Sequence, residues 1–329
     1  MDNIAHALTG AALGQAGLKK LTGLAMPALI LSANLPDIDA VTMLTGGGLY
    51  WRRGWTHGPI ALAVLPVLLA ATLLAFDRWQ ARRGKRPDCR EPVELKPLLL
   101  VCCIGAVSHV LLDLLNTYGV RLLMPFSERW FYGDVLFIVD PWIWLGLGIG
   151  AWLSRRRRLA GKASFGRPAI GALIAAGLYV AAMFAGGRIA ERYTALEIQA
   201  SGLGTPERVL ASPVIVNPFR REMLVQTADG YRFGEYRLTP IPRLTLDTAT
   251  VPTNMSDPAI ARAAEHLKGG KALALDAWAG SQGRAMLRFD YAGCGASSGD
   301  FERQTLHGWR GDVLAVIDEL VEGPVVLVG

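Results

Sequence analysis

Long apolar runs, separated by short charged loops, dominate the first 190 residues of the chain. Two shorter apolar helices are expected at 3–18 and 24–36; at roughly 20–24 Å each, they fit a half-embedded or re-entrant path better than a full span. Four later runs are long enough to cross about 30 Å of hydrocarbon as helices: 58–76, 98–116, 136–153 and 168–187. The pattern therefore predicts a mainly α-helical, polytopic membrane protein with four full transmembrane helices and two short N-terminal membrane helices.

The pattern changes after residue 190. Residues 206–250 hold short β-rich runs bounded by Asn-Pro and Asp-Gly turn signals, which predict a small β-meander, and 257–267 reads as a helix. The remaining stretch reads strand, Gly-rich turn, amphipathic helix, strand. We therefore predict three domains, which are a membrane-embedded domain at 1–190, a small β-rich extramembrane domain at 191–268 and a tail at 269–329.

The composition supports a membrane protein. The chain is 51% hydrophobic and 19% charged, whereas an average soluble domain carries about 25% charged residues. The net charge of +6 would suit a nucleic-acid-binding protein, but much of the positive charge lies in two short loops, at 78–86 and 155–162. Such loops are typical of cytoplasmic anchors beside transmembrane helices, and no nucleic-acid partner is expected.

These basic loops also predict the orientation. Under the positive-inside rule, the loops at 78–86 and 154–162 and the pair Lys19 and Lys20 face the cytoplasm. Threading the chain through these three anchors brings nearly every unusual polar residue to the outer face, although only basic residues set the orientation. Residues after 188 are then expected on the outer side as well.

Histidines and aspartates lie inside or at the ends of the apolar segments. His109 and Asp113 fall within the run at 98–116, four residues apart on one helix face. Ionisable groups at this depth are costly and usually belong to an ion path, a metal site or a reaction centre. Imidazole and carboxylate together suit zinc, manganese or iron. The candidate ligands are His6, Asp37, Asp39, His57, His109 and Asp113.

The alternative is that these groups satisfy buried backbone atoms or pack as hydrogen-bonded pairs. Six of them on one membrane face favour the metal site, which could hold more than one ion. Arg52 and Arg53 could bind an anionic substrate group, or anchor the interface together with Trp51 and Trp55. Asp113 and Arg53 are the candidate catalytic residues. Residues that could orient the ligands are Asn116, Asp134 and Asp140, although Asp140 could equally cap a helix.

Five motifs occur in a fixed order among the hydrophobic helices: MDNIAHALTG, SANLPDID, RRGWTHG, SHVLLDLLNTYG and FIVDPW. Together they resemble the bacterial YdjM-type inner-membrane metal-dependent hydrolases, over about residues 1–265. The resemblance implies a zinc-dependent hydrolase in the inner membrane without an assigned substrate. It also implies that all six candidate residues are ligands. A distant, fold-level relation of that family to zinc phospholipases C and single-strand nucleases favours a phosphodiester.

The tail resembles a different family. LRFDYAGCGASSGDF, followed by a helix and GPVVLVG, is similar to the opening of an α/β-hydrolase of the acyl-thioesterase or serine-esterase kind, over about residues 285–329. In that fold the strand VVLVG leads into the G-x-S-x-G nucleophile turn, which does not follow here. We therefore expect a fusion or frameshift remnant without activity.

The function expected from these observations is that of a membrane-bound metal-dependent hydrolase acting on an ester or phosphoester. Its cofactor would be a divalent metal, zinc or else manganese. Its site would open to the periplasmic side of the inner membrane, where a lipid could enter from the bilayer. The competing interpretation is an intramembrane His/Asp transporter or ion relay. The clustering of polar residues on one face, instead of a chain across the bilayer, counts against it.

Overall fold

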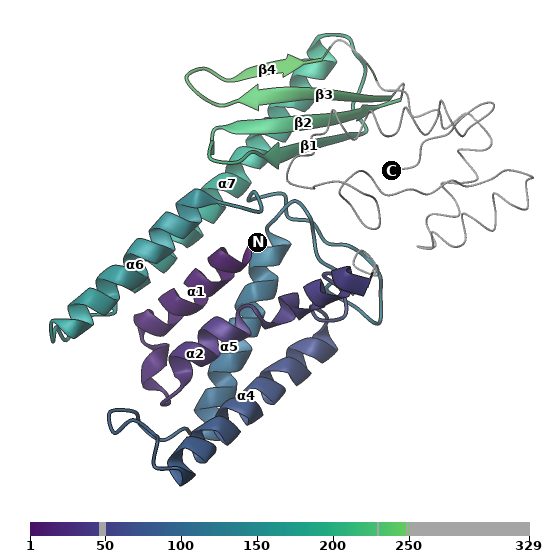
Figure 1. Ribbon diagram of the computed structural model, residues 1–329. Helices are drawn as coiled ribbons and strands as arrows, with labels where there is room; N and C mark the ends of the chain where they lie inside the picture. Colours follow the sequence, from purple (N-terminus) through teal and green to yellow (C-terminus); the bar gives the residue numbers. More distant parts are fainter. Residues whose placement is uncertain (46–50, 229, 248–249, 251–329) are drawn as a thin grey trace, which may run out of the picture. The chain divides into compact units, whose positions relative to one another are not determined.

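The computed structural model describes residues 1–45, 51–228, 230–247 and 250. The described part is mainly helical, with a small antiparallel sheet near its C-terminal end (Figure 1). The α-helices are α1 (Asn3–Ala16), α2 (Ala25–Ser32), α4 (Pro59–Arg82), α5 (Leu95–Leu114), α6 (Pro141–Leu159) and α7 (Arg167–Ala200). Two 3-10 helices accompany them, η1 (Leu18–Lys20) and η2 (Leu35–Thr45). The predicted helix at 257–267 and the predicted tail lie outside the described residues.

Among the described helices, α4, α5 and α7 are long and apolar enough to cross a membrane. The fourth predicted span corresponds to α6, whose last turns carry the consecutive arginines 155–158. These charges shorten its apolar part, and α6 does not meet the same criterion. The membrane character of the chain is confirmed, whereas the number of four spans is not.

The helices pack as a bundle around two apolar cores. One core lies between α2, α4 and α5, and the other between α1, α6 and α7. Two glycines bring helix backbones close together. A Cβ on Gly10 would lie 2.7 Å from the carbonyl oxygen of Leu29, and one on Gly105 would lie 1.9 Å from Ser32 Oγ. Helices α1 and α5 therefore approach α2 nearly backbone to backbone.

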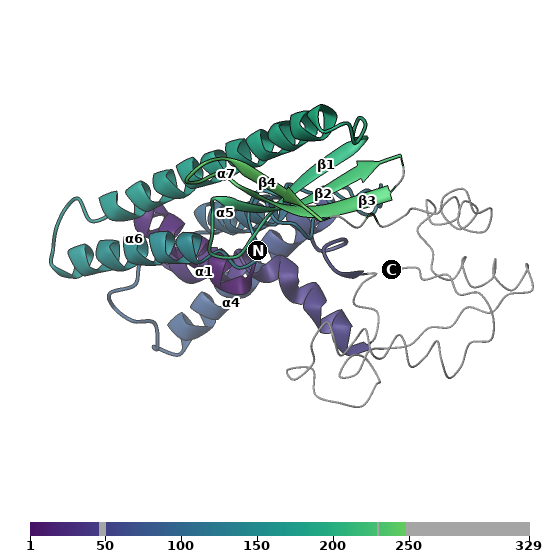
Figure 2. The ribbon, with the colours of Figure 1, turned by 90° about the horizontal axis from the view of Figure 1, so that it is seen from above.

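The predicted β-meander is confirmed. Strands β1 (Arg208–Pro213), β2 (Arg220–Thr227), β3 (Gly230–Arg237) and β4 (Arg243–Leu246) form one antiparallel sheet in the order β1-β2-β3-β4. The sheet packs against the C-terminal part of α7 (Figure 2), where Ala190 and Tyr193 contact a small core containing Met223 and Tyr236. Helix α7 is longer than the predicted run at 168–187 and continues through the predicted boundary at residue 190.

An arginine links the sheet to the helices. Arg221 of β2 is buried, and its Nη2 donates a hydrogen bond to the carbonyl oxygen of Met183 in α7 over 2.6 Å. Its Nη1 lies 3.5 Å from the carbonyl oxygen of Val135. The backbone N–H of Val135 in turn donates to the carbonyl of Leu115, directly after α5. The sheet is thus joined to the segment that closes the end of α5.

Candidate metal centre

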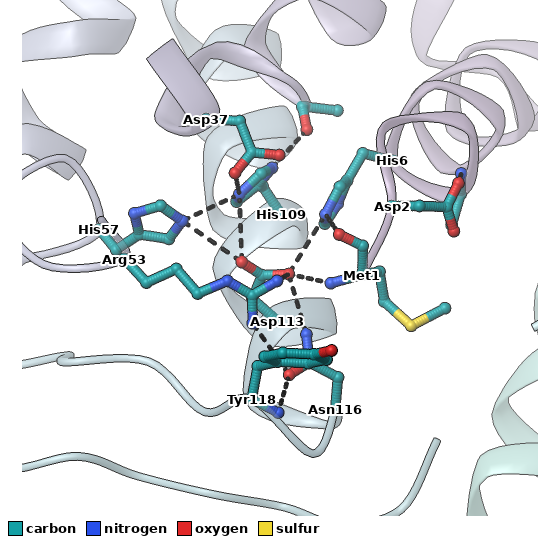
Figure 3. Close-up of polar contacts among 12 residues, drawn as sticks. Met1, Asp2, His6, Asp37, Arg53, His57, His109, Asp113, Asn116 and Tyr118 are labelled. Carbon is teal, nitrogen blue, oxygen red and sulfur yellow. Dashed lines mark hydrogen bonds and ion pairs between the residues drawn. The ribbon is translucent and has the colours of Figure 1, made fainter. Parts of the chain in front are cut away.

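Side chains from three parts of the chain converge at one end of α5 (Figure 3). Helix α5 contributes His109 and Asp113, η2 contributes Asp37, and the turn before α4 contributes His57. One ligand atom from each of these four residues lies within 4.8 Å of the others. His57, His109 and Asp113 are fully buried, and the Asp37 side chain is 10% exposed. This buried Asp/His group could hold a metal ion.

The close approach of α5 to α2 orients His109. Gly105, one turn before His109, leaves no room for a side chain against α2, so the ring reaches the end of that helix. There His109 Nδ1 lies 2.7 Å from the carbonyl oxygen of Ala33. A carbonyl only accepts hydrogen bonds, so Nδ1 carries a proton, and in the neutral imidazole Nε2 is left with a free lone pair.

A three-residue relay orients His57 in the same way. The Thr56 hydroxyl donates its only proton to Asp39 Oδ2 over 2.8 Å. It must therefore accept a hydrogen bond from His57 Nδ1, which lies 2.9 Å away. The backbone N–H of Arg53 donates to the same Asp39 oxygen over 2.7 Å. In the neutral imidazole, His57 Nε2 consequently also presents a free lone pair.

The two lone pairs face each other. His57 Nε2 and His109 Nε2 are 3.1 Å apart, and in two neutral rings with their protons on Nδ1 neither nitrogen can donate to the other. Asp113 Oδ2 lies 3.3 Å from His57 Nε2 and 3.6 Å from His109 Nε2. Within the described residues this buried oxygen accepts no hydrogen bond. Asp37 Oδ1 completes the group at 3.8 Å from His109 Nε2.

This donor set fits a metal ion. With both imidazoles neutral, four acceptor atoms surround one small region, so that two nitrogen lone pairs and two carboxylate oxygens face each other without a proton between them. With metal–ligand bonds of about 2.0–2.2 Å, the ligand atoms of a tetrahedral zinc ion lie about 3.3 Å apart. The nitrogen–nitrogen and nitrogen–oxygen distances of 3.1, 3.3, 3.6 and 3.8 Å are close to that spacing.

The other oxygen of Asp113 has a different environment. His6 Nε2 lies 3.3 Å from Asp113 Oδ1, and Asn116 Nδ2 donates to the same oxygen over 3.3 Å. Arg53 Nη2 lies 3.6 Å away, and the amine of Met1 also pairs with this oxygen. Asp113 therefore divides the centre into a side of acceptors at Oδ2 and a side of donors at Oδ1.

The structure places the remaining two predicted ligands beside the four-residue group. Asp39 lies behind His57, where the relay uses Oδ2. Two residues apart in a 3-10 helix with three residues per turn, Asp37 and Asp39 point in different directions, so only Asp37 faces the two lone pairs. The His6 ring stacks on His109 at 3.8 Å between ring centroids and faces Asp113 Oδ1.

Arg53 is 5% exposed and lies at the edge of the centre. Its Nη1 donates to Asn116 Oδ1 over 2.9 Å and to the carbonyl oxygen of Gly119 over 3.2 Å. The guanidinium also lies over the ring of Tyr118, 5.6 Å from the centroid. Asn116, predicted to orient other groups, thus fixes Arg53 and contacts Asp113.

The other predicted supporting residues do not join the group. Asp140 caps α6, because its Oδ1 accepts hydrogen bonds from the backbone N–H groups of Trp142 and Ile143. Asp134 lies near Glu191 and Arg208, where burial and, to a lesser extent, Glu191 raise its pKa. The residue that sequence reasoning missed is Thr56. A hydroxyl residue directly before a candidate ligand histidine was the available signal.

Comparison with known proteins identifies the family. The family model described as "YdjM inner membrane protein" matches residues 1–190, which is more than half of the chain. The chain therefore belongs to the YdjM inner membrane protein family, as the five motifs predicted. The match covers α1 to most of α7 and includes every residue of the candidate centre.

Individual relatives match smaller parts. YfhP of Bacillus subtilis (strain 168) is 29% identical over 155 residues, which are 44% of this chain and 43% of that protein. The mitochondrial palmitoyl-protein thioesterase ABHD10 of Homo sapiens is 50% identical over 64 residues, and that of Mus musculus 44%. The chain spans about a fifth of the length of these thioesterases and less than half of YfhP. No solved structure matches the chain.

Proposed function

We propose that this YdjM-family protein is a membrane-bound, metal-dependent hydrolase of an ester or phosphoester. The facing Nε2 atoms of His57 and His109, 3.1 Å apart, carry the proposal. Buried acceptors without a donor between them are unfavourable, and a cation relieves this at once. We assign Asp37, His57, His109 and Asp113 as ligands, with zinc or manganese as the ion. The sequence had suggested six ligands.

The surrounding residues have supporting roles in this proposal. Asp39 and Thr56 hold the His57 ring in one tautomer, and His6 fixes the Asp113 carboxylate from its Oδ1 side. When bound, the ion would polarise the scissile group and lower the pKa of a water molecule. Arg53 would hold an anionic group of the substrate, because its Nη2 faces the centre beside Asp113 while Nη1 is fixed by Asn116.

The position of the centre along α5 supports a proposal for the substrate class, and the basic loops support a proposal for the side of the membrane. His109 and Asp113 lie at the end of α5, a candidate span, so the centre is near the level at which lipid headgroups lie. The basic loops support a periplasmic position for this end of the bundle. A phosphoester or ester lipid entering from the outer leaflet is therefore the substrate class we propose.

Bound metal is the decisive measurement. The protein purified in detergent should contain about one zinc or manganese per chain by elemental mass spectrometry, and a His109→Ala/Asp113→Ala variant should contain none. A screen of phosphoesters and lipid esters should then give hydrolysis that a chelator abolishes. A folded wild-type protein that takes up no metal after supplementation would refute the proposal and favour the ion relay.

A further inference from the structure

The loop between β1 and β2 presents apolar side chains to the surroundings. Ile215, Val216 and Phe219 are 49%, 54% and 51% exposed. Three large apolar side chains within five residues are unusual on the surface of a soluble domain, where such groups are normally scattered. Pro218 between them contributes no backbone donor. The loop thus has the surface chemistry of a contact site.

Val216 is held in an unfavourable backbone conformation. Its φ is 69°, in the left-handed region that β-branched residues avoid. Its carbonyl oxygen accepts a hydrogen bond from Trp142 Nε1 over 2.7 Å. The conformation therefore joins the loop to the helix bundle while the Val216 side chain stays exposed.

Trp142 connects the loop to an apolar stripe on α6. Tryptophan is enriched at the level of lipid headgroups, and Trp142 lies in the first turn of this helix. Trp142, Leu145, Ile149 and Trp152 are all about half exposed, and their spacing places them on one face. The stripe ends near the arginines 155–158, which are typical of the opposite interface. The β1–β2 loop is joined to the start of this stripe by the hydrogen bond between Trp142 and Val216.

We propose that the β1–β2 loop inserts Ile215, Val216 and Phe219 into the headgroup region of the same membrane that the helices cross. The occupant is the lipid surface itself, because the loop is joined to the apolar face of α6. The sheet would then be held on the membrane at two places, at α7 and at this loop. The inference does not depend on the proposed hydrolase function.

Spin labelling in lipid vesicles tests the insertion. Single cysteines at Val216 and Phe219 would carry the label, in a full-length chain whose native cysteines are replaced. Leu145→Cys on α6 serves as the lipid control. Leu203→Cys serves as the water control, because Leu203 is exposed and precedes β1 at the opposite end of that strand. Labels at 216 and 219 should collide often with oxygen and rarely with a water-soluble nickel chelate, as at 145.

Two results would overturn the proposal. Nickel collision at 216 and 219 equal to that at 203 would mean that the loop lies in water. Protection from both reagents would mean that a protein, such as a second copy of the chain, covers it. If the cysteine-free chain does not fold, benzophenone-phenylalanine at 219 in the native chain replaces the label. It should cross-link lipid on illumination, and at 203 it should not; equal lipid cross-linking at both positions would contradict insertion.

Discussion

Two buried aspartates near opposite ends of the helix bundle have opposite environments. Asp77 lies near the end of α4, and both of its oxygens are paired with arginines, Arg86 and Arg90. Asp113 lies near the end of α5 and has donors at Oδ1, but at Oδ2 it faces only the lone pairs of His57 and His109. A buried carboxylate with all its partners is structural, whereas one that faces other acceptors is suited to binding a cation.

The comparison is tested most strongly by removing each charge in turn. Asp113→Asn should reduce metal affinity by more than the roughly 10- to 100-fold expected for loss of a supporting residue, because it removes a charged ligand. Metal titration monitored by elemental analysis measures the effect. Asp77→Asn is the matched control and should retain the wild-type metal content. Equal metal loss in both variants would contradict the distinction between the two aspartates.

The relay behind His57 should have the next largest effect. Thr56→Val removes the hydroxyl that accepts a hydrogen bond from His57 Nδ1 and so orients the ring. Metal binding should weaken by about 10- to 100-fold. Thr56→Ser keeps the hydroxyl and should restore most of the affinity. Competition with a chelator of known affinity measures both variants. If the serine variant bound metal as weakly as the valine variant, the hydroxyl would have no role in orienting His57.

At the opposite end of the bundle, where Asp77 pairs with arginines, the expected loss is in stability. Asp77→Asn leaves Arg86 and Arg90 without their carboxylate partner and should reduce the free energy of unfolding by roughly 1–3 kcal/mol. Thermal unfolding in detergent measures this loss. The control is Asp88→Asn, because Asp88 is an exposed carboxylate in the loop that also carries Arg86 and Arg90. A lower melting temperature in the Asp88 variant than in the Asp77 variant would show that the buried pair is not stabilising.

The smallest effect concerns Lys19 in η1, which lies near Arg158 at the end of α6. Burial, with Arg158 and Lys20 nearby, lowers the pKa of Lys19 to about 8 from its ordinary value of 10.5. Below pH 8 the Lys19 ammonium is charged in both the folded and the unfolded state, and the folded state bears the full free-energy cost of burying that charge. As pH rises from 8 toward 10.5, the unfolded chain retains a proton that the folded chain releases, so stability rises.

Lys19→Gln should therefore stabilise the protein at pH 7, by about 0.5 kcal/mol or less because the side chain is only partly buried. The gain should shrink as pH passes 8, and the metal content should not change. Unfolding measured between pH 6.5 and 10 gives the profile, and Lys20→Gln removes a neighbouring charge as a control. A gain that does not vary with pH would contradict the prediction.

The sequence predicted most of the bundle and the sheet, because apolar length and alternation are local properties. Helix ends were less accurate. Helix α4 continues to Arg82, and Asp77 within this extension pairs with Arg86 and Arg90 of the following loop. Four of the six candidate ligands come together, and the i, i+4 spacing of His109 and Asp113 explains one pair.

The rest depended on features that spacing does not reveal. The pair Asp37 and Asp39 suggested two ligands, but the 3-10 geometry of η2 turns Asp39 toward Thr56. The carbonyl of Ala33 that fixes His109 is a backbone atom, for which the sequence carries no residue-type signal. Both features arise from the way segments distant in the chain meet.

Because α7 is one continuous helix, the number of residues in it determines which way the sheet faces. Each residue of an α-helix advances about 1.5 Å and turns about 100°. Deleting one residue between Met183 and Ala190 would swing the sheet by more than a quarter turn, away from the carbonyl that Arg221 binds. Inserting seven residues would nearly restore the direction that the sheet faces, but would move the sheet about 10 Å along the helix axis. The length of this helix therefore sets both the direction that the sheet faces and its distance along the helix axis, and only a change by whole turns preserves that direction.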